Sequence, residues 1–291
     1  MKSGKSKFST ALIVLGTIVL ATAPVVADQF RTEVARWYLA EAANRLVANR
    51  DSSHQLEQAR RWAGDITQLR DYWIVRADQA LASSPQEVAT VIGAAVAQQK
   101  SNTFLADLYS MRLANRRFFS DAVAVLKAGE IPENELDPVR FYSRLNNLSY
   151  FRALAGIELD QALSDINRVL TVSPNDVGVR DTRAWVLFQM GNPQLALEDA
   201  NFVVTSLTAK DNAGWVDVSL AWLEKNVLTP PQPQNTTKLL TRREAGEQLW
   251  TIGTLYYHRA RILEALGRDE EAKQDFQWLS EHNLPIDDSI F

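Results

Sequence analysis

Apolar residues along most of the chain recur every three or four positions, the spacing that places them on one face of an α-helix. From residue 28 onward the spacing is clear in a first set of four: Trp37, Ala40, Ala43 and Val47. No stretch shows the sustained alternation that is typical of a half-buried strand. The pattern therefore predicts an all-α fold in which helices follow one another through short polar connections.

The connections carry residues that commonly begin or end helices. Gly191 and Gly267 each follow a periodic segment, where a glycine in the left-handed conformation often ends a helix. Ser84 followed by Pro85 has the order of a cap residue and a proline at the first helical position. No such residue stands near Leu69, so the sequence leaves open whether the segments on its two sides form one helix or two.

Small residues recur at a spacing that indicates internal repeats. Ala162 and Ala196 lie 34 residues apart, and each is followed by leucine at the next position and aspartate at the third. Two segments share a longer pattern of alanine, glycine seven positions later and alanine five positions after that: Ala184, Gly191 and Ala196, and Ala260, Gly267 and Ala272. Because a small side chain lets two helix backbones approach closely, these positions mark expected helix crossings.

This pattern resembles the tetratricopeptide repeat (TPR) family, whose unit is an antiparallel helix pair of about 34 residues. The resemblance implies a right-handed α-solenoid of TPR-like antiparallel helix pairs, in which the first helix of each pair lines a concave side. The chain then divides into five segments: a signal peptide or membrane anchor (1–27), a divergent TPR-like region (28–137), a TPR pair (138–205), an inserted helix and Pro-rich linker (206–242), and a C-terminal TPR and tail (243–291).

The first segment has the order of an export signal. Lys2, Lys5 and Lys7 precede an apolar stretch, and Val25 and Ala27 are small residues at the expected positions before a cleavage point. Alternatively, residues 8–26 form an uncleaved transmembrane helix that attaches the chain to the membrane. Both alternatives place the helical region on the outer side of the cytoplasmic membrane. The region is then periplasmic or extracellular, and it is either free or anchored to the membrane.

Composition removes several classes of function. The chain has no cysteine, which excludes disulfides, thiolate metal sites and a thiol nucleophile, and its three histidines are too few for a histidine-rich metal site. The net charge of −4 provides no general basic surface for nucleic acid. We therefore expect no metal, no cofactor and no nucleic-acid partner, and we interpret His258 and His282 as surface or helix-capping groups.

Extended peptides commonly dock on the concave side of TPR proteins, so the resemblance implies a protein or peptide partner. Nine residues are expected on that side by register: Asn44, Asp78, Met111, Asn147, Phe151, Asp181, Trp185, Tyr257 and Arg261. The last six are the candidate partner-binding residues, with Phe151, Trp185 and Tyr257 as an aromatic floor. The alternative for Trp185 is that it packs between neighbouring repeats.

The expected function is a non-catalytic protein–protein interaction scaffold of the cell envelope. Two alternatives remain open at this point. The first is a self-associating structural envelope protein, whose oligomeric state the sequence does not give. The second is a helical-solenoid enzyme acting on envelope glycans through two close acidic side chains.

Overall fold

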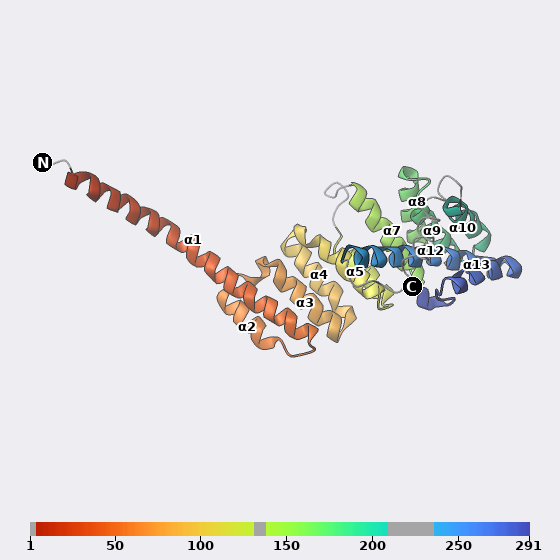
Figure 1. Ribbon diagram of the computed structural model, residues 1–291, viewed down its shortest axis with the longest axis horizontal. Coiled ribbons are helices and arrows are strands. Elements are labelled where there is room, and N and C mark those ends of the chain that lie inside the picture. The colour runs from red at the N-terminus through yellow and green to blue at the C-terminus, as the bar shows by residue number, and fades with distance from the viewer. Residues whose placement is uncertain (1–3, 131–137, 209–235) are drawn as a thin grey trace. The chain divides into compact units, whose positions relative to one another are not determined.

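The computed structural model describes residues 4–130, 138–208 and 236–291, and every regular element in these ranges is helical (Figure 1). The prediction of an all-α fold is confirmed. The inserted helix and the Pro-rich linker, expected near residues 212–228 and 229–235, lie outside the described residues. The chain divides into two compact units, one of residues 1–109 and 127–130 and the other of residues 110–126 and 131–291.

In the first unit, one long helix is followed by shorter ones: α1 (Gly4–Val47), α2 (Ser53–Trp62), η1 (Ile66–Gln68), α3 (Arg70–Ser83), α4 (Pro85–Gln98) and η2 (Lys100–Asn102). Helix α1 packs against α2 and α3, and α3 packs against α4. Three residues of α1 spaced by four and three positions, Ala35, Leu39 and Ala42, are fully buried. The later part of α1 therefore joins this core through a single face.

The second unit contains a run of helices that pack on their neighbours in sequence. After α5 (Thr103–Ala114) and α6 (Phe119–Ala128), which contribute residues to both units, come α7 (Pro138–Ala155), α8 (Leu159–Val172), α9 (Val177–Gln189), α10 (Pro193–Thr208), α12 (Thr236–Ala265), α13 (Asp269–Glu281) and η4 (Asp288–Ile290). Helix α9 packs on α7, α8, α10 and α12, and α12 packs on α10 and α13. Ala184, Ala196 and Ala272 are buried together at these crossings.

Three pairs in this unit close through three-residue turns: α7 with α8, α9 with α10 and α12 with α13. Each turn contains a glycine in the left-handed conformation, Gly156, Gly191 or Gly267, and Glu158 adopts the same conformation in the first of these turns. In each turn the next amide donates to a carbonyl five residues back, as from Asn192 to Leu187 at 2.9 Å. This bond satisfies a carbonyl that the helix end would leave open. The predicted role of Gly191 and Gly267 is confirmed.

A buried ion pair joins the two helices of each of these pairs. The guanidinium of Arg183 donates to both carboxylate oxygens of Asp199, at 2.6 and 2.8 Å. Arg259 and Asp275 repeat the arrangement at 2.8 and 2.6 Å, and Arg152 donates to Asp165 at 2.6 Å. In all three pairs the arginine directly precedes an alanine, and the aspartate lies three positions after another alanine. The aspartates are therefore the same repeat positions that coincide in the sequence.

The structure corrects two local expectations and answers one question that the sequence leaves open. The transmembrane-helix prediction for residues 8–26 is wrong, because no helix among the described residues is long and apolar enough to cross a bilayer; threonines and Pro24 interrupt the apolar run there. The chain near Leu69 is not one helix, since residues 63–69 separate α2 from α3. Helix α4 does begin at Pro85, but the Ser84 side chain makes no capping hydrogen bond.

Replacing Gly191 with alanine tests the turn between α9 and α10. No atom lies within 4 Å of the added Cβ, so the cost comes from the backbone φ of +78°. We expect Gly191→Ala to lower the free energy of unfolding by about 1–2 kcal/mol in urea titrations. Gly178→Ala is the control, because it lies inside α9 with ordinary space for a Cβ. It should be neutral or stabilising by up to about 1 kcal/mol, and equal losses in both variants would refute the assignment.

The buried ion pair of the last helix pair is tested by Asp275→Ala. The carboxylate of Asp275 is 3% exposed, and its loss leaves the Arg259 guanidinium partly buried without its acceptor. We expect a loss of about 2–4 kcal/mol in the free energy of unfolding. Glu271→Ala removes an acid from the same helix that pairs with Arg268 at the exposed surface, and it should change stability little. If the two variants lose the same stability, the buried pair is not a stabilising contact.

Candidate functional site

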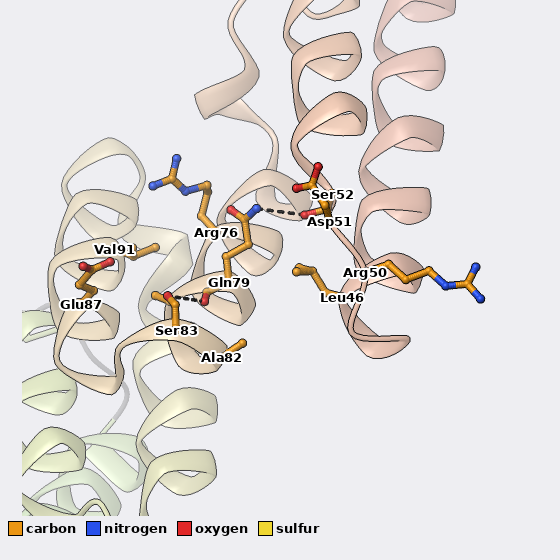
Figure 2. Close-up of a pocket in the computed structure, with 11 residues that line it drawn as sticks. Leu46, Arg50, Asp51, Ser52, Arg76, Gln79, Ala82, Ser83, Glu87 and Val91 are labelled. Atoms are coloured by element: carbon orange, nitrogen blue, oxygen red, sulfur yellow. Dashed lines mark hydrogen bonds between the residues drawn. The ribbon is translucent and has the colours of Figure 1, made fainter.

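A shallow pocket in the first unit is lined by residues of α1, α3, α4 and the connection after α1 (Figure 2). The Gln79 amide donates to the Ser52 hydroxyl at 3.0 Å across it. The guanidinium groups of Arg50 and Arg76 point away from each other, so no charged groups converge on a ligand position (Figure 2). Among the described residues, no cluster of three or more histidine or acidic side chains is arranged to hold a metal ion.

A second location, in the other unit, brings together rings from four separate parts of the chain. We call it the aromatic site; its rings are Tyr150 of α7, Trp185 of α9, Tyr257 and His258 of α12, and Phe291. The His258 ring stacks on Trp185 with centroids 4.2 Å apart and a 20° angle between planes. The ring centroid of Phe291 lies 5.5 Å from the ring centroid of Trp185 and 5.5 Å from that of His258. Such contacts fix ring orientation as well as burying apolar area.

A hydrogen bond between side chains of the aromatic site joins α9 to α12. His258 Nδ1 lies 2.9 Å from both carboxylate oxygens of Asp181, and the His258 side chain is fully buried. Nδ1 is therefore the ring nitrogen that contacts Asp181, and Nε2 is the nitrogen that makes no contact with the carboxylate. The pair therefore fixes the orientation of the His258 ring against Trp185.

Two polar atoms of the stacked rings have no hydrogen-bond partner in the part of the chain that is described: Nε1 of Trp185 and Nε2 of His258. The indole Nε1 carries a hydrogen and is a hydrogen-bond donor. Nearby, burial and then the charge of Asp181 raise the pKa of Tyr150 well above its usual value. The phenol of Tyr150 therefore stays protonated at neutral pH.

The segment 284–291 covers the aromatic site from outside the helix pairs. The Tyr257 hydroxyl donates to Oδ1 of Asp288 at 2.5 Å, and Trp250 Nε1 donates to the Ile290 carbonyl at 2.8 Å. Burial and the bond to Asp288 raise the pKa of Tyr257. Gly253 makes room for the segment, since a Cβ there would lie 2.5 Å from a methyl carbon of Leu284. Ile290 is 1% exposed in this position.

The candidate partner-binding residues fall into two groups. Asp181, Trp185 and Tyr257 meet at the aromatic site and are buried, and Phe151 is buried on α7 beside Tyr150. Asn147 is half-buried on α7, whereas Arg261 is exposed and pairs with Glu264 at 3.3 Å. Of the other residues expected on the concave side, Asn44 and Asp78 belong to the first unit, and Met111 is 45% exposed.

Sequence reasoning missed the contributions of Tyr150, His258 and Phe291. The interpretation of His258 as a surface or capping group is wrong, because its side chain is fully buried. The signal was present: Leu255, His258 and Ile262 are spaced by three and four positions, which places His258 on the apolar face of its helix. Phe291 gave no such signal, since it lies outside any periodic segment.

Comparison with known proteins gives no relative from which a function can be transferred. No family model, no curated protein and no solved structure matches the chain. The arguments below therefore rest on the contacts of the chain itself.

A double-mutant cycle tests the pair of Asp181 and His258. His258→Phe leaves a buried carboxylate without a partner, and Asp181→Leu leaves the Nδ1 proton of His258 without an acceptor. We expect each to lower the free energy of unfolding by about 2–4 kcal/mol, and the double variant to recover at least about 1.5 kcal/mol of the sum. The control cycle pairs Asp181→Leu with Tyr256→Phe, whose ring stacks on Trp278 instead. Its effects should add, and additivity in both cycles would contradict the proposed coupling.

Proposed function

We propose that the second unit is part of a right-handed α-solenoid of TPR-like antiparallel helix pairs. Support comes from three pairs that share a left-handed turn residue and a buried arginine–aspartate bridge. Alanines at the crossings let the backbones of α9, α10, α12 and α13 approach closely. Repetition of one pair geometry is the condition for stacking into a solenoid.

We further propose that the protein is a non-catalytic protein–protein interaction scaffold that binds a peptide or partner domain on the surface formed by α7, α9 and α12. The observation that carries this proposal is the convergence of Tyr150, Trp185 and Tyr257, one from each of these helices, on a single site. An irregular stretch of polypeptide already lies on those rings, held by a side-chain and a backbone hydrogen bond. The surface thus has the chemistry needed to hold an extended peptide.

For the location of the protein we propose export across the cytoplasmic membrane, with cleavage after Ala27. Residues 24–31 are exposed, and Ala35 is the first fully buried residue that follows them. Cleavage at that point would therefore leave the described packing of α1 on α2 and α3 intact. N-terminal sequencing of the protein recovered from cells decides this point, since a chain that still begins at Met1 would contradict it.

Self-association is a second candidate function, because α1 exposes large apolar side chains. Phe30 and Trp37 are 61% and 63% exposed, although their rings contact Trp62 and Tyr38. Exposed apolar surface of this kind is typical of an interface. A molar mass that rises with protein concentration, and stays constant in a Trp37→Lys variant, would favour this function.

Site-specific photo-crosslinking tests the scaffold function. A photoreactive phenylalanine analogue at Arg261, which is exposed on α12, is compared with the same analogue at Lys273, which is exposed on α13. In cells that express the full chain, we expect defined protein adducts from position 261 and few from position 273, with mass spectrometry identifying the adducts. Equal adduct formation at both positions would show that the surface of α7, α9 and α12 is not the binding surface.

A further inference from the structure

The segment 284–291 occupies the aromatic site as a peptide ligand would. It follows α13 after Asn283, whose φ of +54° turns the chain back toward α12. From there, Asp288 accepts the Tyr257 hydroxyl, Ile290 is buried, and Phe291 lies against Trp185, Tyr257 and His258. The segment makes these contacts without adding a regular helix pair to the fold, since only residues 288–290 form a single helical turn.

The contacts define a short recognition pattern. Asp288 supplies an acid to a tyrosine hydroxyl, Ile290 fills a buried apolar position, and Phe291 supplies a ring to a stack. In contrast, the Ile286 side chain is 56% exposed, so it contributes little to the docked face. The site therefore recognises three residues of the segment: an acid, a large aliphatic residue two positions later, and an aromatic residue directly after that.

The same segment is an incomplete ligand. With it in place, Trp185 Nε1 and His258 Nε2 have no hydrogen-bond partner among the described residues, although the side chains are 4% and 0% exposed. Leaving buried polar atoms unpaired weakens a complex relative to one that pairs them. The indole N–H of Trp185 is a donor, and the carbonyl oxygen of a peptide group is the acceptor that would pair with it. A partner peptide that supplies such a group would bind better than the chain's own segment.

We propose that the aromatic site binds a short peptide of a partner protein with the pattern acid, any residue, large aliphatic, aromatic, and that segment 284–291 holds the site until the partner displaces it. This inference rests on the scaffold function proposed above. Because the segment is tethered, its effective concentration at the site is high, and a free peptide competes only if it makes better contacts or if the segment is weakened. The two unpaired polar atoms are where better contacts are available.

Weakening the segment without altering the site provides the test. The probe is a fluorescein-labelled hexapeptide with the sequence of residues 286–291, and its binding to the full chain is followed by fluorescence anisotropy. In Phe291→Ala, the segment loses its ring stack while Tyr257, Trp185 and His258 are unchanged, so we expect the probe to bind at least about tenfold tighter than to the wild type. Ile286→Ala is the control, because that side chain is exposed, and it should bind the probe as the wild type does.

A second variant weakens the docking of the segment at its first residue, Leu284, instead of at its last. Gly253→Ala favours the α12 helix but places a Cβ 2.5 Å from a methyl carbon of Leu284, a residue that the hexapeptide lacks. The same Cβ lies 3.5 Å from Ile290, which the hexapeptide contains, and that is an ordinary contact distance. It should also raise probe affinity, which keeps the test valid if Phe291→Ala folds poorly. Adding Tyr257→Phe to Phe291→Ala should lower probe affinity about tenfold, because the hydroxyl that donates to the acid is gone. A probe with both aspartates replaced by asparagine should show a similar loss.

The outcomes separate this inference from the scaffold function. Hydrogen exchange reports whether residues 284–291 are released while α12 and α13 stay protected. If the segment is released and the probe still binds no better than to the wild type, the inference is overturned. Equal binding of the aspartate-free probe overturns the acidic part of the pattern. Neither result affects the crosslinking comparison of positions 261 and 273, which tests the scaffold function with no assumption about peptide sequence.

Discussion

The close return of one helix onto the next is the constraint on which the second unit depends. Three residues are enough for each turn because a left-handed residue redirects the chain and its neighbour closes a bond five residues back. The helices then lie close enough for alanines such as Ala184 and Ala196 to pack at the crossing. The same proximity brings Arg183 within reach of Asp199, so the ion pair depends on the turn and in return fixes the two helices in register.

The sequence was sufficient for the all-α fold and for the turns at Gly191 and Gly267, because both follow from local preferences. Asn49 and Arg117 also adopt the left-handed conformation, although their residue types predict it less strongly than glycine does. In these turns too, the next amide donates to a carbonyl five residues back, from Arg50 to Arg45 and from Phe118 to Leu113, and this bond is not visible in the residue types. Only one partner of each arginine–aspartate bridge could be recognised in the sequence. The aspartates coincide at the 34-residue repeat, but the arginines lie on the preceding helix, 13 or 16 residues away.

The candidate site was predicted less completely than the fold, and for a physical reason. Register placed Asp181, Trp185 and Tyr257 on the first helices of successive pairs, and the structure brings these three together. What register could not supply was burial, which depends on the segment 284–291 and on the contact of His258 with Asp181. That contact joins residues 77 positions apart, so no spacing rule within one repeat reveals it.

The Asp181–His258 pair also explains why the aromatic site is suited to recognition instead of simple packing. An apolar pair of the same size would stabilise the contact of α9 with α12 as well or better, because burying charged or polar groups costs solvation. The polar pair instead holds the His258 ring in one orientation, with its second nitrogen unpaired beside the Trp185 indole. Apolar rings alone would accept many side chains, whereas unpaired polar atoms discriminate against ligands that cannot satisfy them. Under the proposed peptide-binding function, the stability lost by burying this polar pair is the physical basis of selectivity for a partner.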